Sequence, residues 1–168
     1  MFIGKKDYLL WLDNTEEPYL NKMMIESFPF LMPRNRWTDR IPENFDYRYN
    51  EMYSMPYGWA KEFGYEMLCE IYQALVDANY LEKYRIMDIK EKYGTLCWYD
   101  SGAPKQVFEI IEHYIGKSAH VCQSCGKPAT YMTQGWIGYF CRKCGKKLGA
   151  VKIPKKWWEA DFDDDENN

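Results

Sequence analysis

The sequence predicts an α+β fold that ends in a four-cysteine module. Three observations lead to this prediction. Residues 59–79 repeat apolar side chains at helical spacing, residues 84–100 alternate them as in a β-hairpin, and residues 105–117 return to helical spacing. Two C-x-x-C motifs then follow between 120 and 146. The expected order is therefore helix, hairpin, helix and cysteine module, preceded by an aromatic-rich N-terminal extension.

Length and composition favour a folded chain with three parts. The chain has 168 residues, of which 18% are aromatic, a content that disordered chains do not reach. We expect an α+β domain with an irregular N-terminal extension over 1–119, a cysteine module with a basic segment over 120–158, and an acidic tail over 159–168. The net charge of −3 argues against a chain that binds duplex DNA over its whole surface.

The N-terminal extension contains little regular pattern. Its apolar run, Tyr8 to Leu12, is too short for a signal peptide or a membrane span, so we expect a cytoplasmic protein. A short helix is predicted around Glu16–Phe28. Over 29–57 we expect an ordered loop packed through its aromatic side chains, because four prolines interrupt it: Pro29, Pro33, Pro42 and Pro56.

The central segments carry the clearest patterns. Over 59–79 one helix face is apolar and the opposite face is charged, as in a surface helix packed on a core. The predicted hairpin turns at Gly94, where glycine supplies a positive φ, and it places Met87, Ile89 and Tyr93 on one face. The helix over 105–117 is expected to end at Gly116.

The cysteine pattern predicts one structural metal site. The ligands would be Cys122, Cys125, Cys141 and Cys144, with fifteen residues between the pairs and a glycine after each pair. Six cysteines in a cytoplasmic chain indicate metal binding more than disulfides, and a closed set of four thiolates is typical of structural zinc. Iron, or His120 as a replacement ligand, are the alternatives. The aromatic residues between the pairs suggest a short hairpin around Gly135 or Gly138, hence a zinc ribbon.

A basic segment follows the second cysteine pair. It contains seven basic residues and no acidic one, and two tryptophans come after it. Lysines beside aromatic rings suit contact with the phosphates and bases of a nucleic acid or nucleotide. Alternatively, the lysines offset the charge of the thiolates, or the acidic tail covers them. The candidate residues are Arg142, Lys143, Lys146, Lys147, Lys152, Lys155, Lys156, Trp157 and Trp158.

The predicted hairpin offers a second candidate surface through Lys90, Lys92, Tyr93 and Trp98. An enzyme that uses these lysines with nearby acids is an alternative, although an ordinary hairpin turn also explains the segment. Cys69 and Cys97 are expected to be small buried side chains. A ββα-metal nuclease is disfavoured, because the chain has two histidines and no asparagine between Asn79 and Asn167.

The segment Ile89-K-E-K-Y-G-T-L-C-W-Tyr99, followed by a helix and by Cys122-Q-S-C-G, resembles a family of small proteins of tailed bacteriophages and prophages. The resemblance covers about 58–145 and includes the helix that opens with Gly58–Trp59. It implies a phage origin, a host cytoplasm and, by analogy, action on host defence proteins or host enzymes. Cys97 stands where that family usually has arginine.

Together these observations predict a protein that acts by binding and is not an enzyme. The leading expectation is an accessory factor or inhibitor that engages a host protein, because the metal site is closed and aromatic residues are abundant. Nucleic-acid or nucleotide binding through the basic segment is the second expectation, and an enzyme of unknown class is the third.

Overall fold

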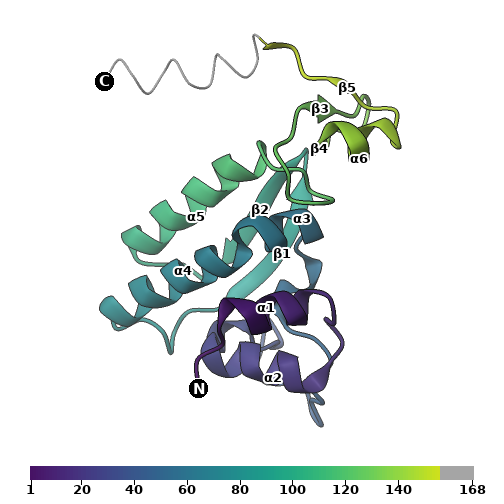
Figure 1. Cartoon of the computed structure of the whole chain (residues 1–168). Helices are drawn as coiled ribbons and strands as arrows, with labels where there is room; N and C mark the ends of the chain where they lie inside the picture. The colour runs from purple at the N-terminus through teal and green to yellow at the C-terminus, as the bar shows by residue number, and fades with distance from the viewer. Residues whose placement is uncertain (156–168) are drawn as a thin grey trace.

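The computed structural model of the chain describes residues 1–155 (Figure 1). The predictions for Lys156, Trp157, Trp158 and the acidic tail lie outside these residues. The architecture is α+β, as predicted, with helices packed around a two-stranded hairpin and a small three-stranded sheet near the C-terminal end. Among the described residues, no helix is long and apolar enough to cross a membrane.

An antiparallel hairpin lies at the centre of the fold. Strands β1 (Ile86–Lys92) and β2 (Thr95–Asp100) pair with Ile89 opposite Trp98, and a bulge between Ile86 and Asp88 shifts the register. The bulge lets both Ile86 and Ile89 face the core. Tyr93 does not share that face as predicted. It lies in the turn, with a φ of 52° beside Gly94 at 83°, and its side chain is exposed.

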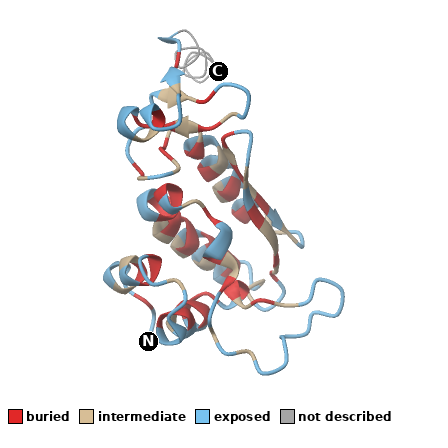
Figure 2. Ribbon diagram, turned by 90° about the vertical axis from the view of Figure 1, so that its right-hand side faces the viewer, coloured by how far each residue is buried: buried red, intermediate tan, exposed pale blue. Residues whose placement is uncertain are grey.

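Two helices lie side by side against the hairpin. Helix α4 (Tyr65–Asp77) packs on α5 (Lys105–Ser118), and α5 packs on β2. Figure 2 shows the buried residues of these elements turned toward one another. The predicted helix end at Gly116 is wrong, since α5 continues to Ser118. The Ser118 hydroxyl accepts a hydrogen bond from the Leu96 amide at 2.9 Å, and this contact ties the helix end to β2.

The predicted helix over 59–79 is confirmed but contains a π-helical turn. Its parts are α3 (Tyr57–Trp59), the π segment η3 (Ala60–Gly64) and α4. A π turn withdraws a carbonyl from regular helical bonding. Here the buried Tyr8 hydroxyl donates to the Ala60 carbonyl oxygen at 2.7 Å, and the missing side chain of Gly64 leaves room for that hydroxyl. The N-terminal segment therefore supports this irregular turn.

The N-terminal segment is more regular than the sequence indicated. Helix α2 (Pro18–Ser27) matches the predicted helix, whereas α1 (Lys5–Leu12) was not expected. An eight-residue helix is marginal by itself, and packing of its buried Tyr8 and Trp11 rings stabilises it. The loop over 29–57 is confirmed. It contains only two short 3-10 turns, η1 (Pro29–Leu31) and η2 (Glu51–Ser54), and its aromatic rings pack on one another.

A buried asparagine joins the N-terminal helices to this loop. Asn21 is fully buried, and its side-chain oxygen accepts from Trp11 Nε1 at 2.9 Å and from Asn50 Nδ2 at 2.7 Å. Its amide nitrogen donates to the Thr15 carbonyl oxygen at 2.8 Å. One side chain thus satisfies polar groups from three separate segments.

Asn21→Ala should therefore lower the free energy of unfolding by about 2 kcal/mol, because it leaves buried N–H groups without acceptors. Urea unfolding followed by fluorescence measures the change. Asn14→Ala is the matched control, since the Asn14 side chain makes one exposed hydrogen bond, to the Leu10 carbonyl oxygen. Equal stabilities of the two variants would contradict the role given to Asn21.

Residues 120–155, the described part of the cysteine module, form the smaller part of the structure. Strands β3 (Tyr131–Met132) and β4 (Tyr139–Phe140) make the predicted hairpin, and β5 (Val151–Lys152) pairs with the other side of β3. Helix α6 (Arg142–Lys146) packs beside these strands. The main core extends from Ile3 to Val121, and a second cluster forms around Cys122, Phe140 and Cys141.

Candidate metal centre and the surface around it

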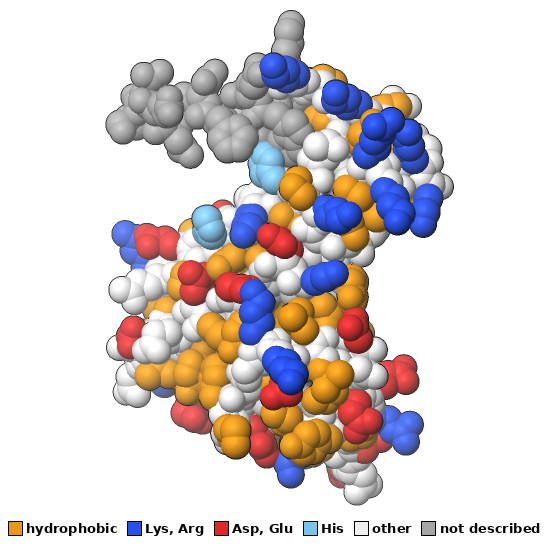
Figure 3. Space-filling model, viewed as in Figure 1, with side chains coloured by type: hydrophobic (Ala, Val, Ile, Leu, Met, Phe, Trp, Pro, Cys, Tyr) orange, Lys and Arg blue, Asp and Glu red, His pale blue; other side chains and the backbone are white. Residues whose placement is uncertain are grey.

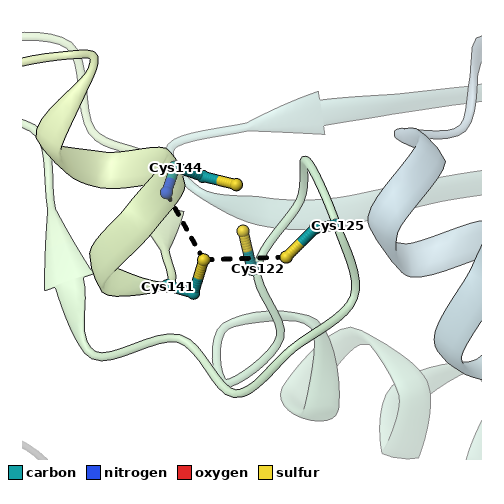
Figure 4. A group of neighbouring side chains, drawn as sticks. All are labelled: Cys122, Cys125, Cys141 and Cys144. Carbon is teal, nitrogen blue, oxygen red and sulfur yellow. Dashed lines mark hydrogen bonds between the residues drawn. The ribbon is translucent and has the colours of Figure 1, made fainter.

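The four predicted ligands come together at one point. The sulfur atoms of Cys122, Cys125, Cys141 and Cys144 all lie within 4.8 Å of one another, and those of Cys125 and Cys141 are 3.6 Å apart (Figure 4). A tetrahedron with metal–sulfur bonds of 2.3 Å has sulfur atoms about 3.8 Å apart. The group therefore fits a single metal ion with no ligand position left for water. Within the described residues His120 is not part of this group.

The first cysteine pair depends on a left-handed glycine. Gly126 has a φ of 84°, and its amide donates to the Cys122 carbonyl oxygen at 2.9 Å. The Cys122 amide in turn donates to the Lys127 carbonyl oxygen at 2.7 Å. These bonds close a tight turn that directs both sulfurs inward, as the spacing predicted.

The second pair is built differently from the prediction. Cys141 caps α6, and its sulfur accepts a hydrogen bond from the Cys144 amide at 3.4 Å. Gly145 lies inside α6 and does not supply a left-handed turn. A Cβ at Gly145 would be 3.0 Å from the Cβ of Tyr131, so this glycine permits close packing of α6 on β3.

The thiols differ in acidity before a metal binds. Burial opposes ionisation of Cys141, but the Cys144 amide and the neighbouring thiols outweigh it and lower the pKa of Cys141 to about 7. Burial and the hydrogen bond with Cys141 raise the pKa of Cys144 to about 12. The lowered pKa of Cys141 favours its thiolate near neutral pH, whereas a bound cation must promote ionisation of Cys144.

The cysteine module is attached to the main core through backbone contacts. Trp59 Nε1 donates to the Val121 carbonyl oxygen at 2.9 Å, and the Gly58 amide donates to the Gln123 carbonyl oxygen at 2.9 Å. A Cβ at Gly58 would lie only 2.0 Å from the Cys122 carbonyl oxygen. The first cysteine pair therefore packs directly against α3, where the helical segment that continues into α4 begins.

A second contact joins the tip of the β1–β2 hairpin to the module. A Cβ at Gly94 would be 2.6 Å from Tyr139 Cε2 and 3.5 Å from Ile137 Cγ2. The hairpin tip thus lies against the β3–β4 hairpin, and two surfaces that are separate in the sequence become neighbours.

No protein-family model, curated protein or solved structure matches this chain. Its function is therefore inferred from the geometry and charge of its own residues.

The predicted basic residues lie on the surface of the cysteine module. Residues 120–155 contain no aspartate or glutamate, and Figure 3 shows lysine and arginine side chains spread over this part of the molecule. Lys127, which precedes the predicted basic segment, belongs to the same surface. The exposed residues are Lys127, Arg142, Lys143, Lys146, Lys147, Lys152 and Lys155.

The second predicted surface is only partly accessible. Trp98 is buried, and its Nε1 donates to the Tyr84 hydroxyl at 3.0 Å, so its prediction as a surface residue is wrong. Lys90 forms an ion pair with Asp88 at 3.0 Å, and this hydrogen-bonded partner raises the pKa of Lys90. Lys92 and Tyr93 remain exposed at the hairpin tip.

A separate concavity lies beside the loop over 33–53. It encloses about 480 Å³ and is lined by Arg34, Arg36, Tyr53 and Glu51, among others. Burial, aided by the charge of Asp88 and opposed by Arg36, raises the pKa of Glu51 to about 7. The fold therefore favours the protonated form of this carboxyl group.

Glu51 should make stability fall as the pH rises. Its contribution is complete below the ordinary glutamate pKa of 4.5 and is lost as the pH rises through about 7, because the unfolded chain releases the proton first. Glu51→Gln should raise the free energy of unfolding at pH 8 by about 1 kcal/mol, after allowance for solvent screening, and change little at pH 4. Urea unfolding at both pH values measures this, and an equal effect at both would contradict it.

Proposed function

We propose that this chain binds nucleic acid through the surface of its cysteine module. One observation carries the proposal: seven exposed basic residues and no acidic residue lie within 120–155. No ion pair in the described part of the chain involves Lys127, Arg142, Lys143, Lys146, Lys147 or Lys152. Four thiolates around a divalent ion offset only part of this positive charge. Such a surface suits the phosphates of a polynucleotide.

We propose zinc as the metal ion of the site. Four inward-facing sulfurs at these separations match the closed tetrahedral set of structural zinc, and they leave no position for a substrate. The ion would then shape the module and take no part in a reaction. Metal analysis of the purified chain distinguishes zinc from iron, and an iron content near one per chain would contradict this assignment.

Binding to nucleic acid should depend strongly on salt. We expect a chain with Lys143→Gln, Lys146→Gln and Lys147→Gln to bind a fluorescent oligonucleotide more weakly. The slope of log K against log salt concentration should become less negative by about 2, because up to three phosphate contacts are lost. Fluorescence anisotropy over a salt series gives this slope.

The matched control replaces three exposed lysines on the surface of the larger part of the chain, outside the cysteine module: Lys6→Gln, Lys22→Gln and Lys105→Gln. It changes the net charge of the chain equally but leaves the cysteine module intact. If both triple variants lose the same affinity, binding reflects overall charge and the proposed surface is wrong. Absence of binding at low salt would remove the proposal.

A protein partner is the second candidate, favoured by the exposure of Trp37. This side chain is 93% exposed in a hydrogen-bonded turn. The Asn35 side-chain oxygen accepts from the Trp37 and Thr38 amides at 2.9 and 3.0 Å, and Arg85 holds Asp39 at 2.9 Å. An exposed tryptophan with arginines nearby in the sequence is typical of residues that dominate protein interfaces.

The host protein expected from the sequence would be this partner. Capture from a bacterial lysate, with Trp37→Ala as the comparison, tests the idea. A partner that binds the unchanged chain and is lost with Trp37→Ala supports it, and the absence of any such partner contradicts it.

A further inference from the structure

The concavity beside the loop over 33–53 combines positive charge with exposed aromatic rings. It encloses about 480 Å³, a volume within the range of small-molecule sites. Its charged lining consists of three arginines and two glutamates, and its exposed rings belong to two tyrosines. These residues are Arg34, Arg36, Arg40, Glu43, Glu51, Tyr49 and Tyr53. One concave surface outside the cysteine module therefore brings guanidinium groups and aromatic rings together.

Hydrogen bonds fix the loop that carries the arginines. The Asn35 amide donates to the Arg40 carbonyl oxygen at 2.9 Å, and the Asp39 amide donates to the Asn35 carbonyl oxygen at 2.9 Å. Arg85, the residue before β1, donates from Nε and Nη2 to the two carboxylate oxygens of Asp39 at 2.9 and 3.4 Å. Arg34 Nη1 donates to the Asp39 carbonyl oxygen at 2.9 Å. The site is therefore preformed, which limits the ordering cost of binding.

Two of the three arginines keep positive charge available to a ligand. Within residues 1–155, no ion pair involves Arg40. Arg36 pairs with Asp88 at 3.9 Å, a separation too long for a direct hydrogen bond. Burial raises the pKa of Glu51 to about 7, so one of the two glutamates favours its neutral form. Positive charge therefore exceeds negative charge in the lining, and an anionic ligand fits it.

Ring contacts hold the two tyrosines in place. Tyr49 meets Phe45 edge to face with ring centres 5.5 Å apart, and Tyr53 meets Tyr49 in the same way at 5.9 Å. The Ser54 hydroxyl donates to the Ile89 carbonyl oxygen at 2.5 Å and ties this segment to β1. Tyr53 nevertheless stays 63% exposed. A positioned, exposed ring of this kind suits stacking on a nucleobase, because every base has a flat face.

We propose that this concavity binds a mononucleotide, with Arg36 and Arg40 contacting its phosphates and Tyr53 stacking on its base. Arginine can pair with phosphate through two parallel hydrogen bonds, and tyrosine offers the base a flat apolar face. A simple inorganic anion would use the arginines and leave the ring without a role. None of the basic residues of the cysteine module lines this concavity, so the site is separate from the proposed nucleic-acid surface.

Two variants of exposed residues test the proposal. Arg40→Gln removes one positive charge, and Tyr53→Leu removes the flat ring while it keeps an apolar contact with Tyr49. Trp37→Ala is the matched control, because Trp37 is an exposed ring of the same loop that does not line the concavity. The probes are ATP, GTP, CTP and UTP, their nucleosides, and pyrophosphate, measured by isothermal titration calorimetry at low salt. Urea unfolding checks that each variant keeps its fold.

The unchanged chain should bind at least one of the four triphosphates, and the matching nucleoside should bind about tenfold more weakly because it lacks phosphates. Arg40→Gln and Tyr53→Leu should each weaken nucleotide binding about tenfold, since each removes one of the two kinds of contact. Trp37→Ala should leave nucleotide binding unchanged, and so should the triple lysine variant of the cysteine module.

Three results would overturn the proposal. In the first, none of the triphosphates binds. In the second, pyrophosphate binds as tightly as the nucleotides and Tyr53→Leu has no effect, which describes a phosphate site without a base. In the third, the triple lysine variant loses nucleotide binding while Arg40→Gln keeps it, which puts the ligand on the cysteine module. Oligonucleotide binding by that module is measured separately, so either proposal can fail without the other.

Discussion

A chain carrying Cys122→Ser should lose its metal ion and unfold its cysteine module. Cys122 is fully buried, and its sulfur is one of four that surround a single point. Structural zinc contributes about 10–16 kcal/mol to the folding of small modules at neutral pH. The local apolar cluster consists mainly of Phe140 and the cysteines themselves, so the module has little apolar burial of its own without the ion. Metal analysis and hydrogen exchange over residues 120–153 measure the two effects.

Cys97→Ser is the matched control for this experiment. Cys97 is a partly buried cysteine in β2 and lies outside the sulfur group, so this variant should keep both the metal and the protection of the module. Hydrogen exchange in the main core, including α4, should change far less than in the module. A metal-free Cys122→Ser chain with unchanged protection over 120–153 would show that the ion has no structural role.

Gly58→Ala should weaken the junction between the module and the main core. The added Cβ would lie 2.0 Å from the Cys122 carbonyl oxygen and 2.7 Å from the Gly126 nitrogen. Both atoms belong to the backbone of the first cysteine pair, which cannot move without disturbing the metal ligands. We expect a loss of about 3 kcal/mol in the free energy of unfolding, as for severe overpacking. Thermal or urea unfolding of the metal-loaded chain measures the loss.

Gly116→Ala provides the opposite expectation for the same chemical change. Gly116 lies in α5, and nothing is within 4 Å of the position that its Cβ would take. Alanine should therefore raise stability by about 0.5–1 kcal/mol through its higher helix propensity. Similar effects of the two substitutions would refute the idea that close backbone contact at Gly58 joins the two parts.

Local patterns in the sequence were sufficient for much of the fold. The helical spacing over 59–79 and 105–117, the turn at Gly94 and the spacing of the cysteine pairs each depend on residues close together in the chain. A C-x-x-C pair followed by glycine specifies a turn that directs two sulfurs to one point, so the four ligands were predictable. Helix α1 was not, because packing against the π turn and α2 stabilises it more than its own residues do.

Other features depend on contacts between distant segments. Trp98 was predicted to belong to a surface with Lys90, Lys92 and Tyr93, but the register of the hairpin pairs it with Ile89, and both side chains are buried. Gly145 looked like a turn residue and instead serves close helix packing.

The sequence alone determined the α+β class, the two long helices, the hairpin and the four cysteines that could hold a metal ion. Only the tertiary structure decided that the hairpin tip lies against the cysteine module, with Gly94 packed on Tyr139. The physical reason is that periodicity and metal-ligand spacing act over a few residues. Burial of Gly58 and Gly94 against the module, by contrast, depends on surfaces that exist only after both parts have folded.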